Sequence, residues 1–252
     1  MRAAVLAALL LAAMPAAGAE ERRSGFADMS AATQAMQADD AANPGMLWVL
    51  DGEGRWSRKA GRTERSCADC HGEAAASMRG VAARYPAIDA ERGEAVDLAG
   101  RIALCQTRHQ EATPAPRESE ASLALTAFVA HQSRGLPIAP PDDPRIALLQ
   151  AEGAALYRMR RGQLNLSCAQ CHDDNAGRRL AGSVIPQGHP TGYPLYRLEW
   201  QGLGSLQRRL RGCTTGVRAE SFAPGSHDAI ALEAYLMSRA AGMPVETPAV
   251  RP

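Results

Sequence analysis

The sequence predicts a mainly α-helical protein in which two related halves follow an N-terminal extension. Two observations support this fold class. Residues 121–134 and 228–241 place apolar side chains at helical spacing, and each segment leads into a Gly-x-Pro sequence, at 135–137 and 242–244. No stretch alternates apolar and polar side chains for more than a few residues, so long strands are not expected.

The two halves repeat the same features in the same order. The pentapeptides CADCH at 67–71 and CAQCH at 168–172 lie 101 residues apart (168 − 67), and a serine precedes each. The apolar segments 124–129 and 231–236 lie 107 residues apart (231 − 124), so the second half has about six more residues between its motif and its last helix (107 − 101). A repeat of about 100 residues indicates a duplicated domain. Further matching pairs are Glu53-Gly54 with Glu152-Gly153 and Gly61 with Gly162.

Residues 1–19 have the pattern of a signal peptide. Arg2 is followed by an apolar run at 3–13 and by the small residues Ala17-Gly18-Ala19. We therefore expect an exported, periplasmic protein. No later stretch is long and apolar enough to span a membrane, so no membrane span is expected in the mature chain.

The remaining chain divides into an extension, two domains and a linker. Residues 20–45 form the N-terminal extension, which we expect to pack on the first domain, with a helix from Ser30 to about Ala42. The predicted domains are 46–138 and 145–252, with the catalytic role in the second. A proline-rich linker at 139–144 joins them.

The charge balance excludes one class of function. The chain has 28 Lys and Arg against 27 Asp and Glu, a net charge of +1. Nucleic-acid binding needs an excess of cations, so no nucleic-acid partner is expected. Six cysteines are too few for a disulfide scaffold of this size, but disulfides can form in an exported protein, so each cysteine is considered separately.

The two CxxCH motifs predict covalent haem c in each half. The thiols add to the vinyl groups of the porphyrin, and the following histidine binds the iron as the proximal ligand. The alternatives are a thioredoxin-like redox CxxC pair, a zinc site or disulfides. A redox CxxC pair lacks its βαβ context here and leaves the repeated histidine unexplained. We therefore predict two haem c groups in two cytochrome c-like domains. The attachment residues are Cys67, Cys70, Cys168 and Cys171, and the proximal ligands are His71 and His172.

The sixth iron ligand is predicted to be a cysteine in both halves. Cys105 and Cys213 lie 34 and 41 residues after their proximal histidines (105 − 71 and 213 − 172), whereas the second half has no methionine before Met237. Met78 in the first half lies only seven residues past His71 (78 − 71). Thiolate ligation lowers the potential of a haem, which hints that one site does chemistry. The alternatives are a Cys105–Cys213 disulfide, inert thiols, or a histidine ligand, with His109 and His189 ahead of His131 and His227.

Cys213 has a basic neighbourhood in the sequence. It ends the segment RRLRGC at 208–213, and Arg218 follows five residues later. Cations beside a sulfur lower its pKa and attract anions, so an anionic substrate is expected here. A solvated basic face, or arginines that neutralise haem propionates, would explain the same residues.

These features together resemble the SoxA family, the dihaem c-type cytochrome subunits of the thiosulfate-oxidising SoxAX complex. The resemblance rests on both SCAxCH motifs, on RRLRGC at 208–213, and on segments 29–37 and 43–49. It covers nearly the whole mature chain, and the RRLRGC segment is its most specific part.

The resemblance implies an enzyme, an L-cysteine S-thiosulfotransferase. SoxAX couples thiosulfate to a cysteine of the carrier SoxYZ, forming a thiosulfonate and releasing two electrons. The family's active-site cysteine, a haem ligand found as a persulfide, corresponds to Cys213, and a substrate-binding arginine corresponds to Arg209. Further substrate contacts by Arg208 and Arg211 are our extrapolation from charge. The implied partners are the cytochrome SoxX in a heterodimer, SoxYZ, thiosulfate and an electron-accepting cytochrome.

Two other classes of function compete with this one. A non-catalytic dihaem electron-transfer cytochrome would use the cysteines as passive ligands, and the arginines before Cys213 argue against it. A haem sensor or structural subunit is the third class, and no effector domain supports it.

Overall fold

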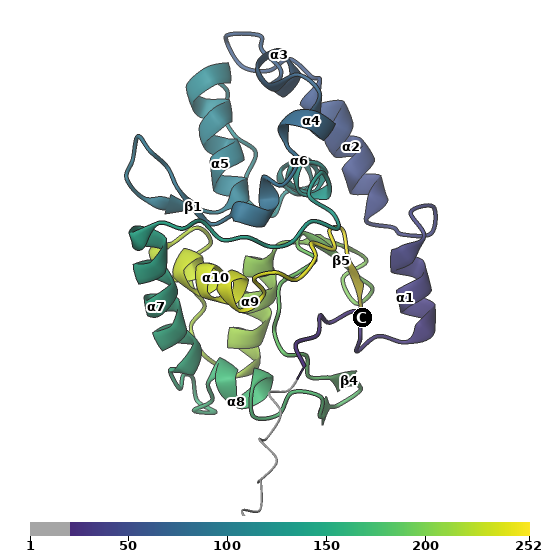
Figure 1. Ribbon diagram of the computed structural model, residues 1–252, viewed down its shortest axis with the longest axis vertical. Coiled ribbons are helices and arrows are strands. Elements are labelled where there is room, and N and C mark those ends of the chain that lie inside the picture. Colours follow the sequence, from purple (N-terminus) through teal and green to yellow (C-terminus); the bar gives the residue numbers. More distant parts are fainter. Residues whose placement is uncertain (1–20) are drawn as a thin grey trace, which may run out of the picture.

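The computed structural model describes residues 21–252, so the predicted signal peptide at 1–19 lies outside the described residues. Helices dominate, and each strand is only two or three residues long. Figure 1 shows α2 to α6 in the upper part of the molecule and α7 to α10 in the lower part. The extension and the first half contain α1 (Ala31–Ala38), α2 (Met46–Trp56), α3 (Cys67–His71), α4 (Ala74–Ser77), the 3-10 turn η1 (Ala82–Arg84), β1 (Ala87–Ile88), β2 (Ala95–Val96), α5 (Leu98–Cys105), the π-helix η2 (Gln106–Gln110) and α6 (Glu120–His131). The second half contains α7 (Pro144–Arg158), α8 (Cys168–His172), β3 (Arg179–Leu180), β4 (Ser183–Val184), β5 (Leu195–Arg197), β6 (Gly202–Gly204), α9 (Leu206–Gly216), α10 (His227–Arg239) and β7 (Val250–Arg251).

The predicted helices are present, with one clear difference at the N-terminal extension. α6 and α10 occupy the two segments with helical apolar spacing. The side chain of Ser30 caps α1 as predicted, but α1 ends at Ala38 instead of Ala42. The backbone of Asp39 is extended, and its carboxylate accepts a hydrogen bond from the Ala41 N–H at 2.9 Å. Such a local turn competes with continuation of the helix.

Each half contains one tightly packed helix pair, α2 with α6 and α7 with α10, and a glycine allows the contact. A Cβ on Gly52 would lie 2.2 Å from the carbonyl oxygen of Ala124, and one on Gly153 would lie 2.0 Å from that of Ala231. The structure thus corrects the sequence match of Gly54 with Gly153. Gly52 is the true equivalent (153 − 101), and a Cβ on Gly54 would meet nothing within 4 Å.

A short hairpin precedes α5 in the first half and α9 in the second half, and the two hairpins have the same register. Ala87 pairs with Val96 in the first hairpin, and Leu195 pairs with Gly204 in the second, so equivalent residues lie 108 apart (195 − 87). The hairpins are exchanged between the halves. The β1–β2 hairpin packs against the core of α7 and α10, whereas Leu203 of the β5–β6 hairpin is buried in the core of α2 and α6.

The hairpin register accounts for the difference in length between the halves. Seven extra residues (108 − 101) precede the second hairpin, in the region that contains β3 and β4. The first half has one extra residue later, within the π-helix η2, because a π-helical turn is wider than an α-helical turn. The net difference is the six residues inferred from the sequence.

The two Gly-x-Pro segments after α6 and α10 pair with each other. Ile138 donates to the Met243 carbonyl at 2.8 Å, and Gly242 donates to the Ile138 carbonyl at 2.8 Å. Equivalent segments that pair in this reciprocal way indicate an approximate two-fold relation between the halves.

The N-terminal extension packs mainly on the second half, which corrects the expectation that it packs on the first. The side chain of Arg22 binds the carbonyls of Arg239 and Ala241, and Ser24 binds Glu246 at 2.5 Å. Figure 1 shows α1 beside the C-terminus. One contact with the first half is an ion pair between Asp40 and Arg134.

Candidate functional site

Both CxxCH motifs form a single helical turn that begins at the preceding serine. The Ser66 hydroxyl accepts from the Asp69 N–H, and the Asp69 carboxylate accepts from the Ser66 N–H at 2.8 Å. Ser167 and Gln170 make the same reciprocal pair before α8. This capping box explains the repeated serine, because it satisfies backbone donors that a helix start leaves unpaired. Each motif therefore presents its two thiols and its imidazole from one short helix.

An aromatic side chain from the preceding helix supports the end of each motif helix. The Trp56 indole donates to the Gly72 carbonyl at 3.1 Å, and its ring centroid lies 5.7 Å from that of His71. In the second half the Tyr157 hydroxyl, at the equivalent position (157 − 101), donates to the Asp173 carboxylate at 2.8 Å. The two halves thus hold their motif helices in the same way.

His172 is oriented for metal binding by its own hydrogen bond. Its Nδ1 lies 2.7 Å from the Pro186 carbonyl oxygen, which can only accept, so Nδ1 carries a proton and Nε2 is the nitrogen that would bind iron. Burial lowers the pKa of His172, but the hydrogen bonds to Cys213 and to Pro186 outweigh burial and raise it. The structure thus brings Cys213 opposite the motif of the second half, where Cys168 and Cys171 also lie within its electrostatic reach.

The thiol of Cys213 lies in a positively charged environment. Burial raises its pKa, but the hydrogen bond with His172 and the charges of Arg209 and Arg197 more than compensate, so the net pKa is lowered. A lowered pKa favours the thiolate, which is both the nucleophile and the iron-binding form.

The three candidate arginines on α9 have different positions. Arg209 lies one helical turn before Cys213 and acts electrostatically on both Cys213 and His172. Arg208 stacks its guanidinium on Trp200, 4.3 Å from the ring centroid, and donates to the Leu203 carbonyl. Arg211 is exposed. The substrate contacts of Arg208 and Arg211 stay predictions.

Cys105 lies beside the motif of the first half but in a neutralised environment. Burial raises its pKa, and the nearby charges of Arg101 and Arg108 do not overcome this effect. Asp89, whose side chain is 1% exposed, binds both arginines, at 2.6 Å to Arg101 and 2.8 Å to Arg108. The two cysteines thus occupy equivalent positions with opposite pKa shifts.

The alternative ligands have other surroundings. The ring of His189 contacts the Arg23 carbonyl at 2.8 Å, and His109 is exposed on the π-helix. All six cysteines, which lie within the described residues, are free thiols, so the Cys105–Cys213 disulfide is absent there. The assignment of both cysteines as iron ligands stays a prediction.

The donor sets in both halves fit haem c. Each motif helix offers two free thiols and one imidazole, and a cysteine from α5 or α9 lies beside it. A cavity of about 170 Å³ adjoins Cys67 in the first half, lined by apolar and polar side chains of α2, α5 and α6 that include Arg55, Ile102 and Leu125. A covalently attached macrocycle needs this combination of thioether donors and an apolar wall.

Comparison with known proteins identifies the family. The model of the SoxA/TsdA cytochrome c domain matches residues 51–138 and 152–245, one match in each half. The SoxA subunit of L-cysteine S-thiosulfotransferase from Pseudaminobacter salicylatoxidans is 39% identical over 233 residues, covering 92% of this chain and 82% of that protein. The chain belongs to the SoxA family. Both matched segments are cytochrome c domains, and proteins of this class bind haem c covalently.

Other SoxA proteins and a solved structure agree with this family. SoxA of Rhodovulum sulfidophilum is 35% identical, covering 92% of this chain and 81% of that protein. A chain in the crystal structure of SoxXA from P. pantotrophus superimposes with a TM-score of 0.88 at 34% identity, covering 92% of this chain and 87% of that chain. Among residues 21–252, no helix is both long and apolar enough to cross a bilayer.

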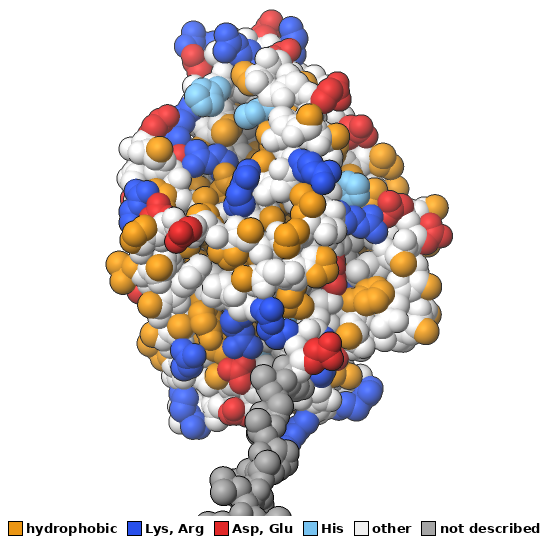
Figure 2. All heavy atoms as spheres, in the orientation of Figure 1, with side chains coloured by type: hydrophobic (Ala, Val, Ile, Leu, Met, Phe, Trp, Pro, Cys, Tyr) orange, Lys and Arg blue, Asp and Glu red, His pale blue; other side chains and the backbone are white. Residues whose placement is uncertain are grey.

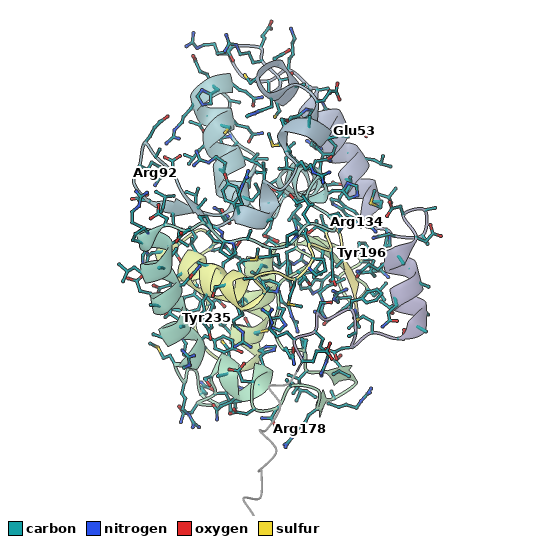
Figure 3. The ribbon with its side chains drawn as sticks, in the orientation of Figure 1. Glu53, Arg92, Arg134, Arg178, Tyr196 and Tyr235 are labelled. Atoms are coloured by element: carbon teal, nitrogen blue, oxygen red, sulfur yellow. The ribbon has the colours of Figure 1, made fainter. Side chains whose placement is uncertain are left out.

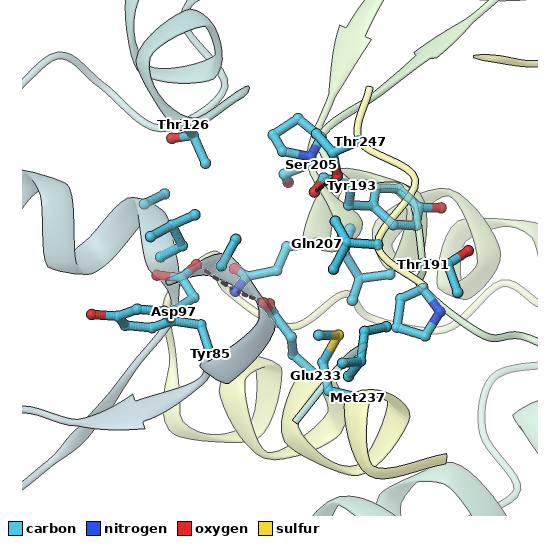
Figure 4. Close-up of a pocket in the computed structure, with 18 residues that line it drawn as sticks. Tyr85, Asp97, Thr126, Thr191, Tyr193, Ser205, Gln207, Glu233, Met237 and Thr247 are labelled. Carbon is cyan, nitrogen blue, oxygen red and sulfur yellow. Dashed lines mark hydrogen bonds between the residues drawn. The ribbon is translucent and has the colours of Figure 1, made fainter. Parts of the chain in front are cut away.

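In this SoxA-family chain a polar network links the helices that carry the two distal cysteines. Figure 4 shows the side chain of Gln207, in the first turn of α9, between two carboxylates. It donates to Asp97, the cap of α5, at 3.0 Å and to Glu233 at 3.1 Å. Arg117 pairs with Asp97 at 2.6 Å, and a cavity of about 80 Å³ lies beside the network between the halves.

Arg197 is the member of the site that the sequence analysis did not identify. It lies 16 residues before Cys213 (213 − 197), on a strand and outside the RRLRGC segment. The repeated Tyr-Pro pair at 85–86 and 193–194 could have identified it. This pair aligns the sequences of the two hairpins, and in that alignment Arg197 is equivalent to Asp89.

Proposed function

We propose that this chain is a periplasmic L-cysteine S-thiosulfotransferase subunit that carries two haem c groups. It acts in a heterodimer with SoxX and conjugates thiosulfate to a cysteine of the SoxYZ carrier. The similarity to SoxA proteins and to the SoxXA structure supports the activity and the SoxX partner. The two CxxCH helices support two haems, and residues 1–19 support export.

The reaction joins two sulfur atoms and needs an electron acceptor. The carrier thiol loses its proton, a sulfur–sulfur bond forms between it and the outer sulfur of thiosulfate, and two electrons leave the pair. Haem, when bound, supplies a route for these electrons toward the cytochrome of the partner and then to an electron-accepting cytochrome. The bond forms in two steps. The Cys213 thiolate joins the outer sulfur of thiosulfate as the two electrons leave, and the carrier thiolate then attacks that sulfur and releases Cys213 as a thiolate, while Arg209 holds the sulfonate end.

The observation that favours Cys213 over Cys105 is the difference in charge around two equivalent thiols. Against the effect of burial, the hydrogen bond with His172 and the charges of Arg209 and Arg197 lower the pKa of Cys213. Burial instead raises the pKa of Cys105, which lies beside arginines already bound by Asp89. A dianionic substrate is attracted where positive charge is not already paired. This asymmetry supports one catalytic cysteine and one passive ligand.

The test is thiosulfate-dependent conjugation with SoxX and SoxYZ present. Cys213→Ala should abolish conjugation while the second haem stays attached through Cys168 and Cys171. Arg209→Ala should lower conjugation about 10- to 100-fold, since a hydrogen bond to a charged group contributes roughly 1.5–3 kcal/mol. Thr215→Ala, an exposed position on the same helix, is the matched control and should conjugate normally.

The competing function is a dihaem electron-transfer cytochrome without catalysis. It expects Cys213→Ala to change the potential and the absorption spectrum of the second haem without loss of any transferase activity. A Cys213→Ala protein that still conjugates thiosulfate at the normal rate would favour the electron carrier and reject the catalytic role.

A further inference from the structure

The duplication allows the two cysteine sites to be compared position by position. Tyr85, Arg101 and Cys105 of the first half correspond to Tyr193, Arg209 and Cys213 of the second, each 108 residues later. The hairpins before these helices share one register, so the same offset applies along them. One charged position is inverted: Asp89 in the first half corresponds to Arg197 in the second (197 − 89).

In the first half Asp89 forms ion pairs with both arginines near Cys105, Arg101 and Arg108. Its side chain is 1% exposed, and it accepts from Arg101 at 2.6 Å and from two nitrogens of Arg108 at 2.8 Å. The guanidinium one helical turn before Cys105 is therefore paired within the protein. An external anion cannot bind Arg101 without displacing this carboxylate.

In the second half the carboxylate that pairs with Arg197 is exposed, unlike the buried Asp89. The side chain of Arg197 is only 12% exposed, and its Nη2 donates at 2.8 Å to Glu199, which is 66% exposed. Its Nε is buried and has no hydrogen-bond partner among the described residues. Burial and the like charge of Arg209 lower the pKa of Arg197. A largely buried guanidinium with an unpaired donor near a second cation is costly unless an anion completes the site.

The direction of Arg197 follows from its strand. Tyr196 packs with Trp48 in the core of the first half, 5.8 Å between ring centroids. Because successive side chains on a strand point to opposite faces, Arg197 is directed away from that core, and its guanidinium lies 5.1 Å from the ring centroid of Trp200. Arg209, on α9, acts electrostatically on both Arg197 and Cys213.

We propose that Arg197 and Arg209 together form the binding site for the dianionic sulfur oxyanion beside Cys213, and that Asp89 closes the corresponding site in the first half. This proposal rests on the proposed function, because it assigns thiosulfate as that anion. Two guanidinium groups supply two positive charges and several donors to the sulfonate oxygens, and they leave the outer sulfur directed toward Cys213.

The test measures binding of an unreactive dianion, sulfate, to the haem-loaded full chain by titration calorimetry at constant ionic strength. Arg197→Asp, which copies the first half, should weaken sulfate binding at least 100-fold. Arg197→Lys, which keeps the charge, should stay within about tenfold of the original protein. Arg92→Asp is the matched control, since it makes the same charge change on the β1–β2 hairpin, where Arg92 pairs with the exposed Glu94 (Figure 3), and it should bind normally.

Several outcomes would overturn the proposal. One is sulfate binding by Arg197→Asp within twofold of the original affinity. Another is an altered spectrum of the second haem with unchanged affinity, which would assign Arg197 to a haem propionate. If Arg92→Asp weakens sulfate binding as much as Arg197→Asp does, the effect comes from the net charge of the protein and not from a site at Arg197.

Conjugation assays on the same proteins separate this proposal from the proposed function. If the chain conjugates thiosulfate normally but its sulfate affinity does not depend on Arg197, the proposed transferase function stands and the Arg197–Arg209 anion site is rejected. If sulfate affinity depends on Arg197 but the chain never conjugates thiosulfate, the transferase function and the assignment of thiosulfate as the anion are both rejected. The two arginines would then form only an oxyanion-binding site.

Discussion

Single charged side chains distinguish the two duplicated cysteine sites. The cysteine, the tyrosine and the arginine one turn earlier are the same in both, while Asp89 and Arg197 carry opposite charges. The helical period also explains why Arg209 and not Arg208 acts on Cys213. Four residues make about one turn, so Arg209 lies on the face of Cys213, whereas Arg208 lies well round the helix and contacts Trp200.

The first prediction concerns Asp89. Hydrogen bonds from Arg108 hold the pKa of Asp89 well below its usual range, despite its burial. A carboxyl whose pKa is lowered by folding stabilises the native state above its unfolded pKa and loses that effect as the pH falls through its folded pKa. Asp89→Asn should therefore lower the melting temperature at pH 7, and the difference from the original protein should shrink below about pH 4. Thermal unfolding from pH 3 to 8 measures this.

The control is Asp142→Asn, since Asp142 lies on the linker segment and forms no ion pair that the structure records. It should leave the melting temperature unchanged at each pH. A constant difference between Asp89→Asn and the original protein across the whole range would contradict the pairing described for Asp89.

Paired helices and exchanged hairpins build each half. The close approach of α2 to α6 and of α7 to α10 depends on Gly52 and Gly153, where the facing carbonyl leaves no room for a methyl group. Each hairpin covers the core of the other half. The residue on its other face, Asp89 or Arg197, then lies on the side of α5 or α9 of its own half. Helical spacing in the sequence predicted the helices, but strands of two or three residues are too short to leave an alternating pattern.

The second prediction compares two glycines of one helix. Gly52→Ala should lower the free energy of unfolding by about 1–3 kcal/mol, because overpacking pushes α2 away from α6. Gly54→Ala should raise it by up to about 1 kcal/mol, because a Cβ there meets nothing and alanine favours the helix. Denaturant unfolding of the two variants gives both values. Equal effects of the two substitutions would mean that the helix contact is looser than described.

At the level of the whole molecule, the two halves are joined by the reciprocal hairpins, the paired Gly-x-Pro segments and the buried polar network around Gln207. The network connects the start of α9 with the cap of α5. Charges on the visible face are mixed, with no single basic patch, in agreement with the near-neutral composition (Figure 2).

The third prediction concerns Glu233 in this network. Burial, together with the negative charge of Asp97, raises the pKa of Glu233 to about 8, against the opposing effects of Gln207 and Arg117. The native state then holds a proton that the unfolded chain releases above about pH 4.5, so stability falls as the pH rises from about 5 to 8. Glu233→Gln should remove this part of the pH dependence, and the variant should be more stable than the original protein at pH 8.

Melting temperatures between pH 5 and 9 measure the effect, with Glu53→Gln as the control at an exposed position. The control should keep the original pH dependence. A Glu233→Gln protein whose stability changes with pH as steeply as the original would show that Glu233 is ionised in the folded state.

The fourth prediction concerns the number of haems. Exported protein, denatured and weighed by mass spectrometry, should retain two haem groups and lack residues 1–19. Replacing Cys67 and Cys70 by alanine should remove one haem, and replacing Cys168 and Cys171 should remove the other. A mature chain with a single haem would reject the dihaem interpretation.

The sequence by itself determined the features that contiguous residues encode. The CxxCH helices, their serine caps, the amphipathic helices and the repeat depend on local hydrogen bonds and helical periodicity, so they could be recognised without coordinates. Tertiary structure alone decided the contacts between distant segments. These are the packing of the extension on the second half, the exchange of hairpins, the pairing of Gly52 with α6, and the position of Arg197 beside Arg209 and Cys213. Such contacts depend on the path of the chain between the segments, which residue type and spacing do not specify.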